Sequence, residues 1–301
     1  MINNKKIVIF TDEAGWHGKQ LEQAFAHLGY DSIFISLSEC YFELRSGKQP
    51  IRIPSLDNEL PCAVFVRGIP GGSLEEVTLY LDFLHALRKL NVPVYNQARA
   101  IEKSVDKAMT SFLLHSAGID TPLTWVVHHR DKALEIAERE LMQGNLVICK
   151  PLFGSQGEGI RLIRKKTDLL WLTDSHGVFY LQRFVQCAGT EFFDYRVFII
   201  NKKVVAAMRR YGQSWLNNVA QGASCEIITP DKRLCDIALQ SVRLLKMDYA
   251  GVDIIEDRAG HLIVIEINSV PAWKGLESVY QQNIAQLLAN DLVNRLILKK
   301  T

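Results

Sequence analysis

The sequence lacks the features that mark nucleic-acid-binding, membrane or secreted proteins. Its 35 Lys and Arg residues almost balance its 33 Asp and Glu residues, for a formal net charge of +2, and no run of basic residues forms an arm for RNA or an anionic surface. The short apolar run near the N-terminus is broken by Thr11, Asp12 and Glu13, too early for a signal-peptide core or a membrane span. We therefore expect a cytoplasmic protein with neither nucleic acid nor membrane as a partner.

Cysteine pairs at metal-binding spacing are also absent. The six cysteines are dispersed along the chain and no C-x-x-C occurs, so we expect reduced thiols and no zinc site. No internal repeat, low-complexity segment or long linker separates independent parts.

The common nucleotide-binding motifs are missing as well. The first turn, TDEAGWHG, lacks G-x-G-x-x-G, which disfavours a nicotinamide cofactor. A later loop, GSQGEG, is not followed by Lys-Ser or Lys-Thr and leads into a strand, so it is not a Walker A loop. If the chain binds a nucleotide, it does so by another arrangement.

What the sequence does contain begins with alternating strand and helix patterns over residues 1–97. This alternation predicts an open α/β sheet of the doubly wound, parallel kind. Ser73 and Glu76 form a capping box at the start of one helix, and Arg67 ends a strand at the edge where such sheets bind ligands. The expected strands are 5–10, 31–37, 62–68 and 92–96, and the expected helices are 18–29 and 73–91.

From about residue 98 the pattern changes to hairpins and single helices, which is typical of α+β structure. Gly118 and Pro122 close the first of these helices, and Gly144 ends the next. The predicted helices are 101–122, 131–144, 235–250 and about 278–299. The predicted strands and hairpins are 124–129, 145–163, 178–185, 194–210 and 251–273.

The hairpin NLVICKPLFGSQGEGIRLI places Lys150 at the end of an apolar strand, directly before a loop with three glycines in six positions. A cation beside freely converging backbone N–H groups suits an anion such as phosphate. The alternative is a glycine-rich hairpin whose lysine has only a structural role.

A second hairpin carries oxygen donors. Glu266 and Asn268 lie two apart on one strand, so their side chains share a face. If the turn near residues 257–260 has an even number of residues, Asp253 shares that face too. Two carboxylates and an amide suit Mg²⁺, whereas the alternative is that Glu266 and Asn268 cap a strand end at the surface.

Seven blocks in this order resemble the ATP-grasp carboxylate–amine ligases, in particular the RimK-like glutamate ligases. The resemblance covers about residues 60 to 280. It implies an ATP-grasp fold preceded by a Rossmann-like parallel-sheet domain: a first domain at 1–97, a central lobe with a glycine-rich lid at 98–180, and a C-terminal lobe with a magnesium site at 181–301. The blocks are DK with Lys107, VICKPLFGSQGEGI, LQRFV, DYRVF, AAMRR, GVDII and VIEINSVPAWKGL.

The resemblance implies ATP and Mg²⁺, or Mn²⁺ in its place, as cofactors. Metal ligands would be Asp253, Glu266 and Asn268, with Arg210 and Arg196 beside the transferred phosphoryl group. ATP would be bound by Lys107, Lys150, Gly154, Ser155, Gly157, Gly159, Gln182, Arg183, Phe184 and Val185. Arg67 and Asn218 are weaker candidates for substrate contact, and His17, Trp215 and Trp273 are open to either a substrate or a structural role.

The implied reaction has two steps: a carboxylate attacks the γ-phosphate of ATP, and an amine then displaces phosphate from the acyl phosphate. L-Glutamate is the expected amine and a small molecule the expected acceptor. SWLNNVAQGA lacks the cations found in ligases that modify protein tails, and this and NSVPAWKGL resemble the branch that glutamylates one-carbon carriers of the tetrahydromethanopterin or methanofuran type. Relatives are commonly dimers or tetramers.

Three alternatives remain open on the same scaffold. One is a RimK-type ligase acting on a peptide or protein tail. The second is a phosphotransferase that forms no amide, and the third is a non-catalytic ATP-binding module, which would tolerate loss of Asp253 or Glu266.

Overall fold

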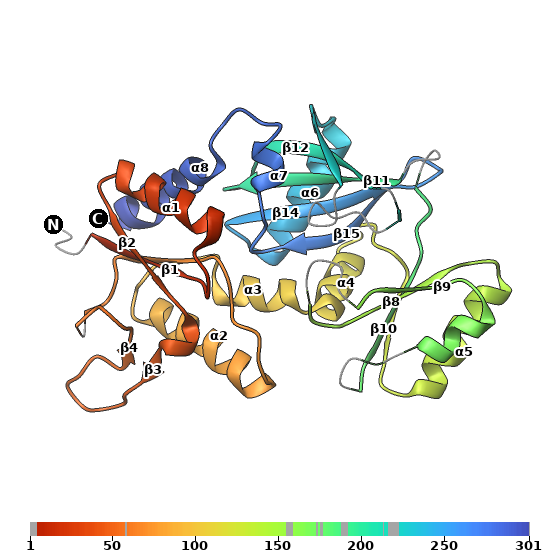
Figure 1. Cartoon of the computed structure of the whole chain (residues 1–301), viewed down its shortest axis with the longest axis horizontal. Helices are drawn as coiled ribbons and strands as arrows, with labels where there is room; N and C mark the ends of the chain where they lie inside the picture. The colour runs from red at the N-terminus through yellow and green to blue at the C-terminus, as the bar shows by residue number, and fades with distance from the viewer. Residues whose placement is uncertain are drawn as a thin grey trace.

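Three larger sheets and one two-stranded sheet are present in the computed structural model. It describes residues 5–57, 59–154, 159–172, 174, 177–187, 192–212, 214–215 and 223–300. In Figure 1 a parallel N-terminal sheet lies at the left, a small antiparallel middle sheet at the right, and the C-terminal sheet above. No helix in the described part of the chain is long and apolar enough to cross a bilayer.

The N-terminal sheet confirms the predicted parallel architecture. Its strand order is β2 (Asp31–Ile35), β1 (Lys6–Phe10), β5 (Ala63–Val66) and β6 (Val94–Tyr95), and all pairs are parallel. Alternate residues of its strands face opposite sides, so one face packs on α1 (Gly15–His27) and the other on α2 (Leu74–Lys89).

The predicted capping box is present at the start of α2. The Glu76 amide donates to Ser73 Oγ at 3.2 Å, and the Ser73 amide donates to Glu76 Oε2 at 2.7 Å. A short two-stranded ribbon between β2 and β5 was not predicted, because two-residue strands carry no readable alternation. It consists of β3 (Tyr41–Phe42) and β4 (Ile51–Arg52), and a 3-10 turn at Leu37–Glu39 precedes it.

The single helix predicted at 101–122 is wrong. The structure has α3 (Ala98–Val105) and α4 (Lys107–Ser116), separated at Asp106. The Asp106 carboxylate accepts from the Met109 amide at 3.0 Å, so it caps a new helix instead of continuing the old one. This break makes Lys107 the first residue of α4.

The helix predicted at 278–299 is also divided. Asn283 caps α8 (Ile284–Asp291) by accepting from the Gln286 amide at 2.8 Å. Before it lies the short α7 (Lys274–Glu277), and after it the chain continues as a π-helical turn at Leu292–Ile297 and a 3-10 turn at Leu298–Lys300.

The middle sheet is antiparallel in the order β7 (Thr124–Val127), β10 (Phe179–Arg183), β8 (Val147–Lys150) and β9 (Arg161–Ile163). The predicted hairpin of β8 and β9 is confirmed. Its apolar face packs against α5 (Arg130–Met142) and the 3-10 segment Lys166–Trp171. Lys150 therefore ends a buried strand, at the point where the glycine-rich loop begins.

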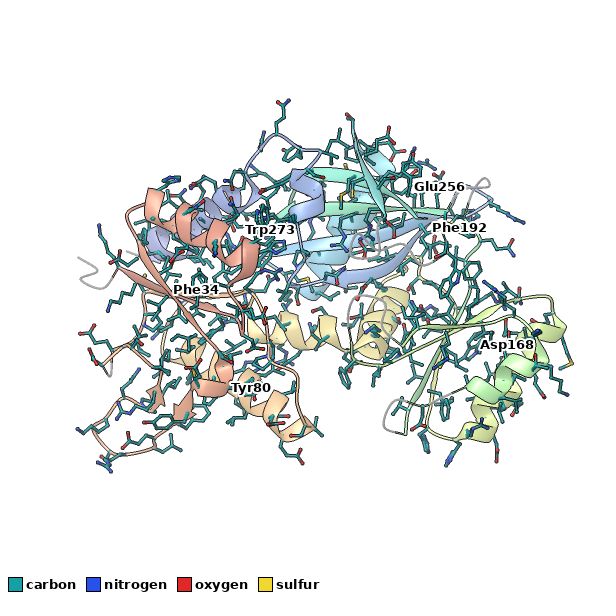
Figure 2. The ribbon with its side chains drawn as sticks, in the orientation of Figure 1. Phe34, Tyr80, Asp168, Phe192, Glu256 and Trp273 are labelled. Carbon is teal, nitrogen blue, oxygen red and sulfur yellow. The ribbon has the colours of Figure 1, made fainter. Side chains whose placement is uncertain are left out.

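The C-terminal sheet has the order β13 (Ser224–Ile228), β12 (Lys203–Gly212), β11 (Phe192–Ile200), β14 (Tyr249–Glu256) and β15 (Leu262–Asn268). One face is covered by α6 (Lys232–Leu245), which begins three residues earlier than predicted because Asp231 caps it. Part of the other face shares a core with α1, α8 and the N-terminal sheet. Trp273 is fully buried in that core, between α1 and the sheet (Figure 2).

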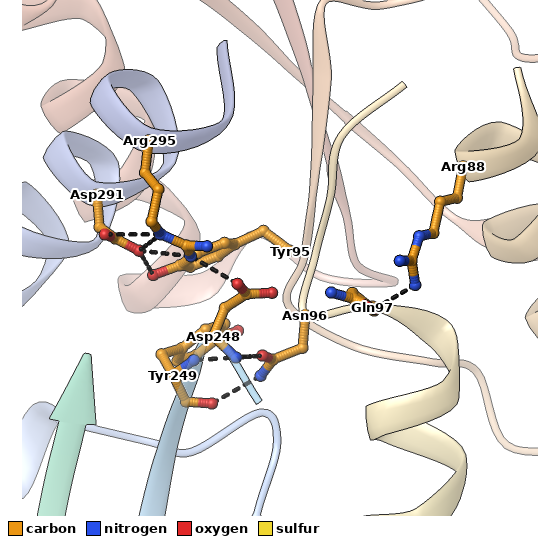
Figure 3. A network of polar contacts seen from close by, with 8 residues as sticks. All are labelled: Arg88, Tyr95, Asn96, Gln97, Asp248, Tyr249, Asp291 and Arg295. Atoms are coloured by element: carbon orange, nitrogen blue, oxygen red, sulfur yellow. Dashed lines mark hydrogen bonds and ion pairs between the residues drawn. The ribbon is translucent and has the colours of Figure 1, made fainter. Parts of the chain in front are cut away.

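A buried asparagine joins the N-terminal and C-terminal sheets (Figure 3). Asn96 Nδ2 donates to the carbonyls of Tyr249 at 2.7 Å and Ser269 at 2.8 Å, and Oδ1 accepts from the amides of Asp248 at 2.6 Å and Tyr249 at 3.2 Å. The Tyr95 ring stacks on the Tyr249 ring at a centroid distance of 4.9 Å. This junction fixes the position of the N-terminal sheet beside the end of β15.

Asn96→Ala should destabilise the fold by about 2–4 kcal/mol, because it leaves several buried backbone groups without partners. Denaturant unfolding gives this free energy. Gln23→Ala, an exposed amide on α1, is the control and should change it by less than about 0.5 kcal/mol. Equal effects of the two substitutions would contradict a structural role for the Asn96 contacts.

Candidate active site

Asp253, Glu266 and Asn268 lie on one face of the C-terminal sheet. Asp253 pairs directly with Glu266 across β14 and β15, and Asn268 pairs with Gly251, two residues from Asp253. Asp253 therefore shares this face as predicted, but not because the turn is even-numbered. Five residues, 257–261, separate the paired strand ends, and a bulge directly after Asp253 restores the pairing with Glu266. The three side chains present two carboxylates and one amide to the same side of the sheet.

Two arginines occupy the adjoining part of this face. Arg196 on β11 pairs in register with Asp253 and binds it through Nε and Nη2, the second contact being 2.9 Å long. Arg210 on β12 reaches the same carboxylate, with Nη2 3.0 Å from Asp253 Oδ1. Asn268 Nδ2 adds a contact of 3.4 Å to Asp253 Oδ2. Asp253 is thus the common partner of both predicted catalytic arginines.

Asp194 completes this network and was missed from the sequence. It pairs in register with Arg210 and accepts from Arg210 Nε at 2.6 Å and Nη2 at 2.9 Å. The signal that was available is its spacing, since Asp194 and Arg196 are two apart on β11 and must share a face. Asp194, Arg196, Arg210 and Asp253 are each at most 9% exposed, so two positive and two negative charges compensate one another in the interior.

The two aspartates differ electrostatically. Burial opposes ionisation of Asp253, but Arg196 and Arg210 outweigh it and hold the pKa of Asp253 below its usual value. At Asp194 burial dominates: Arg210 offsets it only partly and the Asp253 charge adds to it, so the pKa of Asp194 is raised. The pKa of Asp253 is therefore below its usual value and that of Asp194 above it, so Asp253 keeps its negative charge more readily.

Two lysines face Glu266 from the neighbouring elements. Lys150 Nζ donates to Gln182 Oε1 at 2.6 Å, and Lys107 Nζ donates to the Gly154 carbonyl at 2.9 Å. Burial lowers the pKa of Lys150 to about 8, with Glu266 opposing the change and Lys107 adding to it. Burial likewise lowers the pKa of Lys107, which Glu266 also opposes. The lysines and Glu266 are thus close enough to interact across two sheets.

Gln182 is held in place by a chain of hydroxyl groups. Its Nε2 donates to Tyr180 Oη at 2.8 Å and to Thr124 Oγ1 at 3.0 Å, and Tyr180 Oη lies 2.7 Å from Ser111 Oγ. With both donors occupied, the amide oxygen of Gln182 faces Lys150. Gln182, which is predicted to line the adenine, thus also positions Lys150.

The backbone amides of the next two residues, Arg183 and Phe184, form hydrogen bonds within the protein. Arg183 turns its side chain to Glu140, with contacts of 2.9 and 2.7 Å, and its amide donates to the Leu123 carbonyl at 2.9 Å. The Phe184 amide donates to the Leu146 carbonyl at 2.8 Å. Any contact of Arg183 with a base would therefore come from its carbonyl, with the Val185 amide beside it.

The other predicted residues separate into three groups. Gly154 and Gly159 flank the loop at positive φ, and a Cβ on Gly159 would lie 2.8 Å from Pro151 Cγ, so the turn requires glycine there. Ser155, Gly157 and Asn218 lie outside the described residues. Arg67 lies apart from the arginine network, at the end of β5, where Nη1 donates to the Val270 carbonyl at 3.3 Å.

The oxygen donors present suit magnesium. Among the described residues Glu266 forms no hydrogen bond or ion pair, and Asn268 Oδ1 accepts none, so both have free oxygens beside Asp253. No group of three His, Cys, Asp or Glu side chains in the described ranges forms a metal site, so the set depends on the Asn268 amide. Asp253 would join it by sharing oxygens that now face arginine.

Comparison with known proteins identifies the family. Residues 104–292 match the model of the RimK-like ATP-grasp domain, which is more than half of the chain. The chain belongs to the RimK-like ATP-grasp family. This confirms the resemblance found in the sequence, and the protein is an ATP-dependent carbon–nitrogen ligase with an ATP-grasp fold.

Individual relatives of this RimK-like protein cover almost its whole length. It is 32% identical over 292 residues to the tetrahydromethanopterin:alpha-L-glutamate ligase of Methanococcus maripaludis, covering 95% of this chain and 97% of that protein. It is 29% identical to the probable alpha-L-glutamate ligase 2 of Hahella chejuensis, covering 91% and 90%. The ATP-grasp ligase PsnB, solved with a phosphomimetic variant of a minimal precursor, Mg and ADP, shares the fold at a TM-score of 0.75 and 19% identity, covering 97% and 99%.

Nucleotide affinity of this RimK-like protein should fall as the pH rises above about 8. Lys150 is protonated below its folded-state pKa of about 8 and neutral above it, so its attraction for phosphate is lost on the alkaline side. The dissociation constant of Mg-ADP, measured by calorimetry, should rise by up to about tenfold per pH unit there. In Lys150→Arg, which stays charged, the constant should change much less; identical pH profiles would assign the dependence to another group.

Asp194→Asn should lower kcat by about 10- to 100-fold, because Arg210 loses a charged partner that sets its orientation. The affinity for Mg-ADP should change less than about threefold, since Asp194 does not lie beside the lysines. Asp236→Asn, an exposed aspartate on α6, is the control for general effects. A parallel loss of kcat, nucleotide affinity and thermal stability would indicate a merely structural role.

Proposed function

We propose that this protein joins the amino group of L-glutamate to a carboxylate of a one-carbon carrier cofactor of the tetrahydromethanopterin type. One observation carries the reaction class: two lysines, a free glutamate and two buried arginines converge where the middle and C-terminal sheets meet. Such a set neutralises the charge of a triphosphate and of a carboxylate under activation. The near-full-length similarity to a named glutamate ligase supports the substrate class.

ATP would lie between the two sheets. Lys107 and Lys150 would bind its phosphates, because both are half-buried cations and, among the described residues, the acidic charges that act on them are Glu266 and, for Lys107, Asp106. The Arg183 carbonyl and the Val185 amide would face the base. Binding then replaces the repulsion between two lysines with attraction to phosphate.

Glu266, Asn268 and Asp253 would hold magnesium. When bound, the ion supplies charge neutralisation at the phosphate oxygens. Arg196 and Arg210 each have a second role, because a contact that Asp253 gives up frees guanidinium N–H groups to bind an oxygen of the transferred phosphoryl group. Asp194 keeps Arg210 in place during this exchange.

The reaction proceeds by two displacements. A carboxylate oxygen of the acceptor attacks the γ-phosphorus, the bond to the β-phosphate oxygen breaks, and ADP leaves with an acyl phosphate formed. The glutamate nitrogen then attacks the carbonyl carbon, the carbon–oxygen bond to phosphate breaks, and inorganic phosphate and a proton are released with the amide. Positioning the three reactants is the main contribution of the protein.

Glu266→Gln should reduce amide formation by at least about 100-fold while the fold and thermal stability are retained, since a neutral amide binds Mg²⁺ poorly. Glu226→Gln, an exposed residue of β13 in the same sheet, is the matched control and should remain active. A normal rate of ADP release by Glu266→Gln would contradict the magnesium assignment.

The acceptor is tested by mass analysis of products formed from Mg-ATP and L-glutamate with tetrahydromethanopterin, a methanofuran precursor and a peptide ending in glutamate. A gain of one glutamyl residue on tetrahydromethanopterin alone is the expected result. Gain on the peptide alone would replace the cofactor with a protein tail as the acceptor, and a phosphorylated product without an amide would indicate a phosphotransferase.

A further inference from the structure

A second group of cations lies at the end of the N-terminal parallel sheet, outside the residues assigned to ATP and magnesium. In the order β2-β1-β5-β6 the chain leaves β1 toward one edge and β5 toward the other, so the ends of β1 and β5 form the switch point where open α/β sheets bind ligands. The amides of Arg67 and Gly68 donate to the Phe10 carbonyl at 2.9 and 3.0 Å, which brings the two strand ends together.

Arg67, His17 and Lys274 meet at this point from three different elements. His17, in the first turn of α1, accepts through Nε2 from the amides of Trp273 at 3.2 Å and Lys274 at 3.3 Å. The Arg67 guanidinium carbon lies 5.4 Å from the centre of the Trp273 ring. Burial lowers the pKa of His17 to about 4, and the positive charges of Arg67 and Lys274 add to the effect. His17 is therefore uncharged at neutral pH and holds the backbone of Trp273 and Lys274 in place.

These cations have no charged partner in the described part of the chain. Neither Arg67 nor Lys274 forms an ion pair with a described residue, although Arg67 is largely buried. Among the described residues Arg67 Nε and the indole N–H of the fully buried Trp273 also lack an acceptor. Buried donors without acceptors are costly, which favours an anion here.

One loop lies beside both this cluster and the arginine network. The loop from Ser269 to Lys274 directly follows Asn268, and Arg67 binds its Val270 carbonyl. A Cβ on Gly251 would lie 2.9 Å from Arg196 Nη1 and 3.0 Å from Pro271 Cβ, so the same loop also packs beside Arg196. A molecule with one carboxylate at Arg196 and another at Arg67 would therefore lie along this loop.

We propose that Arg67 and Lys274 bind a substrate carboxylate that does not react. This proposal rests on the proposed amide-forming function, because glutamate retains both of its carboxylates in the product. The ligand chemistry is a carboxylate, supplied by the amino acid or by a second acid group of the acceptor. The arginine provides a planar pair of donors and the exposed lysine a point charge at the entrance.

Arg67→Gln and Lys274→Gln test the site, each with Lys299→Gln, an exposed lysine outside the cluster, as the control. We expect at least about a tenfold rise in KM for one of the two substrates, with Mg-ADP affinity unchanged. A rise for L-glutamate assigns the amino acid to the site, and a rise for the acceptor assigns the acceptor. Lys274 is exposed, so its variant gives an answer even if Arg67→Gln fails to fold.

A binding measurement separates this proposal from the proposed function. Calorimetric titration of wild type and Lys274→Gln with L-glutamate and with glutarate, in the presence of Mg-ADP, needs no turnover. Weaker binding by the variant supports the site even if no amide is formed by wild type. Unchanged KM values for both substrates, or unchanged binding of both probes where no amide forms, would overturn the site and leave the ligase intact.

Discussion

The Asp253 carboxylate, shared between two buried arginines, is the contact on which the arrangement of this face depends. Breaking such a group of charges leaves an uncompensated charge in the interior, which typically costs about 3–5 kcal/mol. The three residues come from three different strands: Arg196 from β11, Arg210 from β12 and Asp253 from β14. The network therefore requires all three strands in one register, and this register also places Glu266 opposite Asp253.

The facing lysines follow a different electrostatic logic. Lys107 and Lys150 repel one another and are close to the charge of Glu266, and burial lowers the pKa of both. In the proposed function, a nucleotide phosphate would stabilise the charged forms of both lysines, and relief of their repulsion would favour its binding. The charges of the arginine network compensate one another without a ligand. We therefore propose that the arginines serve positioning and the lysines serve binding.

Much of this could be predicted from the sequence because the decisive spacings are local. Alternation along a strand places Glu266 beside Asn268, and a glycine loop between apolar runs gives the hairpin of β8 and β9. Asp194 could have been found from its spacing, two residues before Arg196, but an isolated acid on a strand is ordinary until its arginine partner on the next strand is known. The break at Asp106 was not predicted because the local sequence is compatible with two structures: one continuous helix, or two helices with the Asp106 side chain capping the second.

Arg67, His17 and Trp273 could be named singly from the sequence as candidates for substrate contact, but not their meeting with Lys274. Lys274 is more than two hundred residues from Arg67 and His17 and reaches them only through tertiary packing. In the proposed assignments, Trp273 would let one segment serve both sites. Its side chain fills the core between α1 and the C-terminal sheet, which fixes the loop that follows Asn268. The same ring lies beside Arg67 and His17, with ring centres of His17 and Trp273 4.6 Å apart. If the proposed assignments hold, Trp273 sets the distance between the arginines assigned to phosphoryl transfer and the cations Arg67 and Lys274. We then expect a core substitution at Trp273 to alter the substrate length that the site accepts.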